Sequence, residues 1–359
     1  MQEIVVSRRV AFGPNAIRRI SSVCDDIGIS KIMVFSGSTK TQKITHNLIL
    51  PELENHIEYD YISLSDSITL EDLKNYATNL ADVNTQLMAV GGGKIIDYVK
   101  VIASIAKRDY IAVPTNASHD GFSSPYINFL LREKIKMERK KSNFPRYIPI
   151  SPLAIIGDTK LVSQASESSI SAGVGDVLSK SVAIRDWRLA NRLKGEKFDI
   201  YAATFAEMTA TLVSDRVCTL GHGFISEKGA RDLLKALASS GVAMCIAGSS
   251  RPASGSEHLV SHALDKIAEK EGLNIAHGHK TGLISILMMY LHGGDWQKIH
   301  HVLKRVNAPL TLKDLKLDRD IFLDAVKIAQ KIRPNRYTIL SEGITKSALI
   351  NALEITGID

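Results

Sequence analysis

Residues 86–97 read QLMAVGGGKIID, an apolar run followed by three glycines and the start of a helical pattern. The run from Gln86 to Val90 is typical of a buried strand, whereas apolar residues between Lys94 and Ile105 recur at helical spacing. The glycines allow a tight turn and let the main chain approach a ligand without interference from a Cβ atom. Because a helix N-terminus presents free N–H groups and the positive end of its dipole, the segment predicts a phosphate-binding turn. A tight turn without a ligand is the alternative.

The alternation of strands and helices continues on both sides of this turn. Short apolar runs predict further strands at residues 31–35, 59–64 and 110–113 and within 147–157, and an amphipathic stretch predicts a helix at 69–80. Strand, helix and strand at this spacing are typical of a parallel α/β sheet. We therefore expect a Rossmann-like, dinucleotide-binding α/β domain over residues 1–162.

From about residue 163 the pattern changes, and helical periodicity continues to the C-terminus. Apolar faces recur at helical spacing in residues 174–190, 202–220, 229–246, 281–291 and 321–332. We predict an all-helical domain over residues 163–359. Because domain interfaces are favoured positions for ligands, we expect the active site in the cleft between the two domains.

The composition fits an ordinary globular protein. The 359 residues are 45% hydrophobic and 23% charged, which excludes disordered, collagen-like and disulfide-scaffold chains. No stretch of about 20 apolar residues occurs, so we expect no membrane insertion. The first residues lack the pattern of a secretory signal, and Cys24, Cys218 and Cys245 are odd in number and widely spaced. These features predict a cytoplasmic protein with reduced cysteines.

The formal net charge of +7 is concentrated in residues 132–146, REKIKMERKKSNFPR, which hold seven Lys or Arg and two Glu. Such a segment could bind nucleic acid or attract anionic substrates. Lys134 and Lys136 alternate with Ile135 and Met137 at the period of a strand, which predicts a solvated hairpin. No series of aromatic residues is interleaved with the basic ones, so we expect no nucleic-acid partner.

Two strand-end segments are candidates for ligand binding. Residues 113–124, VPTNASHDGFSS, form a polar loop after a predicted strand, where open α/β sheets bind ligands. Residues 35–38, FSGS, follow an earlier strand and contain no acidic residue that would bind an adenosine ribose hydroxyl. Small residues there leave room for a 2′-phosphate, so the choice between NAD and NADP stays open.

Two pairs of histidines lie near one another in the sequence. Residues 254–264, SGSEHLVSHAL, begin with a helix-capping signal, and His258 and His262, four residues apart, share one face of the predicted helix. Residues 276–280, AHGHK, place His277 or His279 in a loop or in the first turn of the next helix. Buried packing histidines are the alternative reading of these positions.

Asp176, within the segment GVGDVLSK at residues 173–180, is the candidate carboxylate. One aspartate and two histidines would give an ion three protein ligands and leave positions open for water or substrate, which is typical of catalytic metal sites. Alternatively, Asp176 lies early in a helix and only interacts with the helix dipole.

The segments GGGKIID, PTNASHDG, GVGDVLSK, SGSEHLVSHALD and AHGHKTG occur in one order along nearly the whole chain. Together they resemble the dehydroquinate synthase-like, iron-containing alcohol dehydrogenase superfamily, and within it the sn-glycerol-1-phosphate dehydrogenase family. The resemblance implies a metal-dependent NAD(P) oxidoreductase that reversibly reduces dihydroxyacetone phosphate to sn-glycerol 1-phosphate, for archaeal-type phospholipid synthesis. It implies NAD or NADP and one Zn²⁺ per subunit as cofactors.

The resemblance also assigns roles to individual residues. The metal ligands would be Asp176, His258 and His277, and Asp120 and His262 would contact the substrate, so that Asp120, His262 and Asp176 form the catalytic set. The residues implied in cofactor binding are Gly93, Lys94, Ile95, Ile96, Asp97, Thr115, Asn116, Ala117, Ser118 and Ser124.

One departure from the family pattern affects the third metal ligand. The family commonly has His-Gly-Glu where this chain has His277-Gly278-His279, which leaves His279 as an alternative to His277. The substrate phosphate needs a basic group, for which Arg251, Lys280 and the turn at Gly278 are candidates.

Other functions stay open at this point. A glycerol dehydrogenase or a dehydroquinate synthase-like lyase of the same superfamily would share these motifs. A noncatalytic metal- or nucleotide-binding protein would bind the same ligands without turnover. We expect a small-molecule substrate and a homo-oligomer whose size the sequence does not determine.

Overall fold

The computed structural model describes residues 3–37, 39–65, 67–80, 84–271 and 275–359. Ser38, part of the predicted strand-end segment FSGS, lies outside the described residues. The chain divides into two compact units, one formed by Met1–Ala117 with Gly121–Ala165, the other by Ser118–Asp120 with Ser166–Asp359. A three-residue piece of the long polar loop thus belongs to the second unit.

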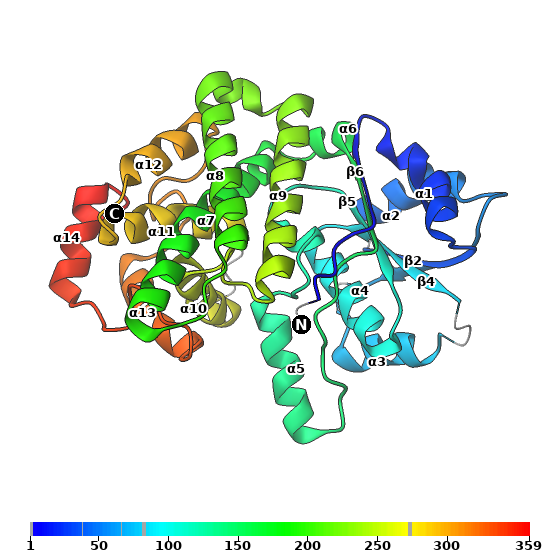
Figure 1. Ribbon diagram of the computed structural model, residues 1–359, viewed down its shortest axis with the longest axis horizontal. Coiled ribbons are helices and arrows are strands. Elements are labelled where there is room, and N and C mark those ends of the chain that lie inside the picture. The colour runs from blue at the N-terminus through cyan, green and yellow to red at the C-terminus, as the bar shows by residue number, and fades with distance from the viewer. Residues whose placement is uncertain (1–2, 38, 66, 81–83, 272–274) are drawn as a thin grey trace. The chain divides into compact units, whose positions relative to one another are not determined.

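The first unit contains a six-stranded sheet in the order β1-β6-β5-β4-β2-β3, in which every pair of neighbouring strands is parallel. This confirms the predicted parallel α/β sheet. The strands can be followed in Figure 1 and are β1 (Arg9–Gly13), β2 (Lys31–Gly37), β3 (Glu58–Leu64), β4 (Gln86–Gly91), β5 (Tyr110–Pro114) and β6 (Ala154–Asp158).

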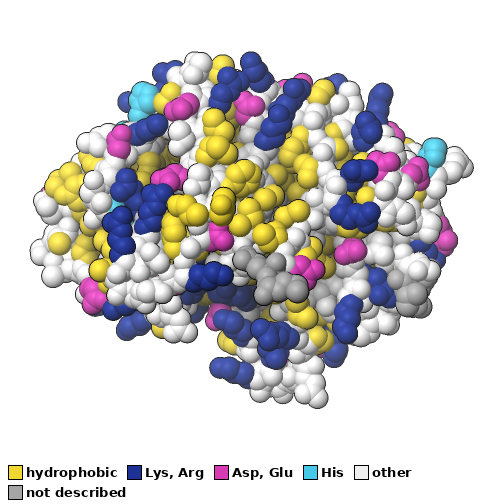
Figure 2. All heavy atoms as spheres, in the orientation of Figure 1, with side chains coloured by type: hydrophobic (Ala, Val, Ile, Leu, Met, Phe, Trp, Pro, Cys, Tyr) yellow, Lys and Arg dark blue, Asp and Glu magenta, His cyan; other side chains and the backbone are white. Residues whose placement is uncertain are grey.

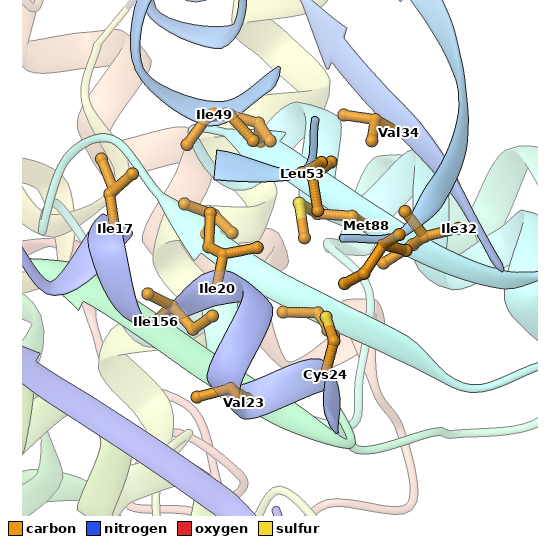
Figure 3. Close-up of a cluster of buried hydrophobic side chains, with 14 of the residues drawn as sticks. Ile17, Ile20, Val23, Cys24, Ile32, Val34, Ile49, Leu53, Met88 and Ile156 are labelled. Atoms are coloured by element: carbon orange, nitrogen blue, oxygen red, sulfur yellow. The ribbon is translucent and has the colours of Figure 1, made fainter. Parts of the chain in front are cut away.

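Helices cover both faces of this sheet because side chains alternate along each strand. Ile32, Met88 and Ile156 point to one face and pack with Ile20 and Cys24 of α1, as Figure 3 shows. The opposite face holds α4, which contacts β2, β4 and β5. The helices of this unit are α1 (Ile20–Ile27), α2 (Lys40–Ile44), α3 (Leu70–Thr78), α4 (Gly93–Ala106), α5 (Phe129–Lys141) and α6 (Thr159–Ser163).

The predicted basic hairpin is wrong, because this segment forms helix α5. Asn128 caps its start by accepting a hydrogen bond from the amide of Leu131, and Leu131 and Ile135 are buried on one side. Arg139, Lys140 and Lys141 occupy its last turn, where positive charge stabilises the negative end of the helix dipole. Figure 2 shows Lys and Arg side chains gathered over α5.

The observed strands differ from the prediction at two further places. Residues 147–150 form no strand, and only the later part of the predicted stretch becomes β6. Strand β1 was not predicted, because as an edge strand it is only partly buried and its sequence RVAFG contains no long apolar run.

The second unit consists of helices joined by loops, with no strand among its described residues, which confirms the prediction of a helical C-terminal region. Helices α8 and α9 lie side by side (Figure 1). None of the helices in the described part of the chain has the length and apolarity that crossing a membrane requires. The helices are α7 (Glu167–Lys194), α8 (Ile200–Leu220), α9 (Glu227–Ala247), α10 (Ser256–Glu271), α11 (His277–Leu291), α12 (Trp296–Arg305), α13 (Arg319–Ile332) and α14 (Lys346–Thr356).

Glycines allow α7 and α11 to pack closely. A Cβ atom on Gly175 would overlap the carbonyl oxygen of Gly278, and one on Gly282 would lie 2.9 Å from Cα of Gly175. Asp176 and His277 are the chain neighbours of Gly175 and Gly278. The close approach of the two backbones therefore brings these two candidate ligands together.

This packing predicts a large cost for one added methyl group. We expect Gly175→Ala to destabilise the second unit by about 1–3 kcal/mol, because two backbones must separate to admit the methyl. Gly223→Ala is the matched control, since its Cβ meets no atom within 4 Å, and it should stay within about 0.5 kcal/mol of the wild type. Urea unfolding followed by circular dichroism measures both. Equal midpoints for the two variants would contradict the packing described.

Candidate active site

The glycine turn lies at the carboxyl edge of the sheet. Strand β4 ends at Gly91 and helix α4 begins at Gly93, with Gly92 extended between them. The amide of Thr115, after β5, donates a hydrogen bond to the carbonyl of Gly91 at 3.1 Å. A Cβ atom on Gly92 would lie 2.9 Å from Nδ2 of Asn116, so a larger residue there would require the Asn116 side chain to move.

The strand order of the sheet reverses beside this turn, which marks this edge as a position for a ligand. After β2 and β3 the chain returns to place β4 on the other side of β2, and β5 and β6 continue outward from it. Open α/β sheets bind ligands at the carboxyl ends of the strands at such a switch point. The turn and the start of the loop after β5 are therefore suited to a dinucleotide.

The predicted cofactor residues differ in what their side chains can offer. Ile95, Ile96 and Ala117 are buried, so they would contact a cofactor through the main chain, and Gly93, Lys94, Thr115 and Asn116 are at least partly exposed. Ser118 belongs to the second unit. The hydroxyl of Ser124 accepts a hydrogen bond from the amide of Tyr126 at 3.1 Å.

Asp97 has its carboxylate engaged within the first unit. It accepts hydrogen bonds from Lys100 Nζ at 3.1 Å and from the amide and the side chain of Asn128 at 2.9 Å each. Lys100 is fully buried and also donates to the carbonyls of Gly121 and Tyr126. These bonds fix the loop after β5 against α4, so the side chain of Asp97 stabilises the position of this loop.

Three side chains from separate helices of the second unit meet in one cluster. Asp176 comes from α7, His258 from α10 and His277 from the first turn of α11. Nε2 of His258 lies 3.9 Å from Oδ1 of Asp176, Nε2 of His277 lies 3.7 Å from the same oxygen, and the two nitrogens are 3.2 Å apart.

This arrangement fits a divalent metal. Ligand atoms bound at about 2.0–2.2 Å around a tetrahedral ion lie about 3.3–3.6 Å from one another, close to the separations seen here. Oδ1 of Asp176 is buried and accepts no hydrogen bond from any described residue. A buried carboxylate oxygen without a donor is costly unless it has a partner of another kind. Two imidazoles and one carboxylate are ligands that suit zinc or iron.

Asp176 lies too far from the N-terminus of its helix for its role to be an interaction with the helix dipole. Helix α7 begins at Glu167, capped by Ser166, rather than near residue 174 as the sequence pattern suggested. The interaction with a helix dipole falls off within the first turn. The side chain of Asp176 is 0% exposed, so its charge must be offset by direct partners.

Glu257 contacts the ring nitrogen of His258 that faces away from the cluster. This role was not predicted from the sequence. Oε1 of Glu257 lies 2.7 Å from Nδ1 of His258 and also accepts a hydrogen bond from the amide of Gly255. A carboxylate on Nδ1 fixes the proton there and leaves Nε2 of His258 to bind a metal. The sequence feature that could have indicated this role is an acidic residue directly before a candidate ligand histidine.

Asp120 and Lys180 lie beside the cluster. Nζ of Lys180 is 3.0 Å from Oδ2 of Asp176 and 2.9 Å from Oδ2 of Asp120, which also accepts a hydrogen bond from Ser240 at 2.6 Å. Burial by itself raises the pKa of Asp120, but the charge of Lys180 and the Ser240 hydrogen bond outweigh it and lower the pKa to about 2. Asp120 is therefore a carboxylate throughout the neutral range. Sequence reasoning did not identify Lys180 or Ser240.

The second predicted substrate residue, His262, also lies here. Its ring stacks on that of His277 with centroids 6.3 Å apart, and its Nδ1 is 3.6 Å from Oδ2 of Asp265. Burial, and then the nearby His258, lower the pKa of His277 well below its usual value, which keeps it neutral as a ligand must be. The ring of His119, which was not predicted, lies 5.7 Å from that of His277.

The three residues that the sequence left as alternatives, one metal ligand and two phosphate-binding residues, all have partners in the structure. Nε2 of His279 lies 2.9 Å from the hydroxyl of Ser171 and takes no part in the Asp176 cluster. Arg251 forms a buried ion pair with Glu196 and donates a hydrogen bond to the carbonyl of Tyr337 at 2.9 Å. Lys280 pairs with Asp265 and lies close enough for its charge to act on His277.

The position of Glu257 generates a prediction about metal affinity. We expect Glu257→Ala to weaken Zn²⁺ binding about 10- to 100-fold, because Nδ1 of His258 loses the acceptor that fixes its tautomer. Glu257→Gln keeps an acceptor oxygen and should lose less. Competition with a chromophoric chelator measures both affinities, and wild-type affinity in Glu257→Ala would show that this carboxylate does not support the site.

Comparisons with known proteins place the chain in a family. The model of the family described as iron-containing alcohol dehydrogenase matches residues 11–166. Glycerol-1-phosphate dehydrogenase (NAD(P)+) from Pyrobaculum neutrophilum is 39% identical over 99% of this chain and 98% of its own length. The protein of the same description from Caldivirga maquilingensis is 40% identical over 98% and 97%.

A solved structure shows the same fold. The structure of a probable glycerol dehydrogenase from Sinorhizobium meliloti covers 99% of this chain and 98% of its own, with a TM-score of 0.74 and 18% identity. That identity bears on the fold alone, whereas the relatives above extend over the full length at much higher identity. The chain belongs to the glycerol-1-phosphate dehydrogenase (NAD(P)+) family.

Proposed function

We propose that the protein interconverts dihydroxyacetone phosphate and sn-glycerol 1-phosphate by hydride transfer with NAD(P)H. The observation that carries the proposal is the cluster of Asp176, His258 and His277 with Asp120 and His262 beside it, in a chain of this family. In the reducing direction, the bound cofactor would supply the hydride for C2 of the substrate, and the C2 oxygen would take up a proton. A cytoplasmic homo-oligomer remains part of the proposal.

The cluster would hold one Zn²⁺, which when bound supplies a Lewis acid for the substrate oxygens. The protein's own residues would then orient the substrate. Asp120, held as a carboxylate by Lys180 and Ser240, would accept a hydrogen bond from a substrate hydroxyl. His262, one helical turn after His258, would hold the C2 oxygen and deliver the proton to it.

The cofactor would bind the first unit at the glycine turn. Its pyrophosphate would contact main-chain groups from Gly93 to Asp97 at the N-terminus of α4, where the helix dipole favours negative charge. Thr115 to Ser118 and Ser124 would complete the cofactor site from the loop after β5. The buried side chains of Ile95, Ile96 and Asp97 support the proposal that these contacts are made by the backbone.

The proposal is tested by NADH oxidation with dihydroxyacetone phosphate, measured before and after metal chelation, with chiral analysis of the product. We expect chelator-sensitive turnover that yields only sn-glycerol 1-phosphate. Asp176→Asn should be inactive and still bind NADH, because the site loses a charged ligand but the glycine turn is untouched. Oxidation of glycerol without turnover of dihydroxyacetone phosphate would favour a glycerol dehydrogenase, and no redox turnover with either would favour the lyase.

Lys280 is the residue we propose for the substrate phosphate. It is 4% exposed, pairs with Asp265 on the helix that carries His262, and acts electrostatically on His277. Arg251, the other basic candidate, is likewise paired with a carboxylate, that of Glu196, so the choice rests on the closeness of Lys280 to His277. Lys280 thus combines a positive charge with closeness to the ligand cluster.

Removal of this charge should weaken binding of the phosphorylated substrate specifically. We expect Lys280→Met to raise the KM for dihydroxyacetone phosphate about 10- to 100-fold, because one hydrogen bond to a charged group is lost. The KM for NADH should change little. Lys298→Met, on α12, is a control for loss of a lysine from the same unit. Equal KM values for dihydroxyacetone phosphate in the two variants would assign the phosphate to other residues.

A further inference from the structure

We propose that Lys180 is a positioning residue that holds Asp176 and Asp120 in one fixed arrangement; this inference rests on the function proposed above. Lys180 lies one helical turn after Asp176 on α7, and its side chain is 1% exposed. Its ammonium lies 3.0 Å from Oδ2 of Asp176 and 2.9 Å from Oδ2 of Asp120. One buried cation thus joins the candidate metal ligand to the candidate substrate residue.

The two oxygens of Asp176 have different partners as a result. Oδ2 accepts hydrogen bonds from Lys180 and, at 3.1 Å, from the main-chain amide of Asp120. Oδ1 faces Nε2 of His258 and of His277, and no described residue donates a hydrogen bond to it. Rotation of the carboxylate would break both bonds to Oδ2, so Lys180 directs a single oxygen toward the histidines.

Asp120 depends on the same bonds for its position. It belongs to the short segment Ser118–Asp120 rather than to one of the long helices of the second unit. Its carboxylate is held by Lys180 from α7 and by Ser240 from α9, and its amide is held by Asp176. Lys180 contributes to both carboxylates, whereas Ser240 contributes to Asp120 alone.

Because Ser240 bonds to Asp120 alone of the two carboxylates, variants of Lys180 and Ser240 separate the effect of Lys180 on Asp176 from its effect on Asp120. Cobalt(II) in place of zinc has a visible absorption that is strong in four-coordinate sites and weaker at higher coordination, and it can be recorded without substrate. In Lys180→Met, Oδ2 of Asp176 loses its cation and can turn toward the ion. We expect a weaker and shifted cobalt absorption, together with a KM for dihydroxyacetone phosphate raised about 10- to 100-fold and an unchanged KM for NADH.

Ser240→Ala should alter only one of these readouts. It removes a hydrogen bond to Asp120 and leaves Asp176 untouched, so we expect the wild-type cobalt spectrum with a KM for dihydroxyacetone phosphate raised about tenfold. Lys298→Met controls for loss of a paired lysine of the second unit, because Lys298 lies on α12 and pairs with Asp215 rather than with Asp176 or Asp120. Its cobalt spectrum should match the wild type.

A wild-type cobalt spectrum in folded Lys180→Met would overturn the inference. If that variant does not fold, the double variant Lys180→Met/Asp120→Asn replaces it under the same criterion, because it removes one buried negative charge together with the buried positive one. A wild-type KM for dihydroxyacetone phosphate in Ser240→Ala would overturn the part that concerns Asp120. Failure of the wild-type protein to bind cobalt would instead remove the metal site on which the proposed function rests.

Discussion

The site depends on the unequal environment of the two oxygens of one buried carboxylate. Asp176 is fully buried on α7, with Oδ2 bonded to Lys180 and to the amide of Asp120, while Oδ1 faces His258 and His277. A buried carboxylate needs such partners, because the loss of hydration is otherwise uncompensated. The oxygen that receives no hydrogen bond is the one placed for a cation. The hydrogen bonds to Oδ2 of Asp176 thus determine which of its oxygens is available to a metal.

Backbone packing makes this environment possible. Glycines at 175, 278 and 282 let α7 and α11 approach until their backbones touch, which sets Asp176 opposite the first turn of α11. The N-terminus of α10 is fixed by Asp186, which accepts a hydrogen bond from the amide of Ser256 at 2.6 Å, and Glu257 then orients His258. Each ligand candidate is therefore held by a helix end or a helix contact, and none depends on a loop alone.

Much of the fold could be read from the sequence, because strand and helix periods are local. The turn from β4 to α4 and the pairing of His258 with His262 on one helix follow from spacing alone. The short polar–apolar alternation around Ile135 led to the wrong prediction, because so short a stretch is also compatible with a helix. Asn128 caps that helix, and Leu131 and Ile135 are buried on one side of it. The role of Lys180 could not be predicted, because a lysine four residues after an aspartate is usually an exposed pair, and only packing against the segment Ser118–Asp120 buries it.

We propose that Asp176 binds a metal through one oxygen while Lys180 holds the other. A crystal structure of the zinc-loaded protein, with anomalous scattering recorded at the zinc edge, tests it most directly. We expect one peak within about 2.0–2.2 Å of Oδ1 of Asp176 and of Nε2 of His258 and His277, with Oδ2 of Asp176 still bonded to Lys180. A peak bound by His279, a peak bridged by both oxygens of Asp176, or zinc located away from these residues would contradict it.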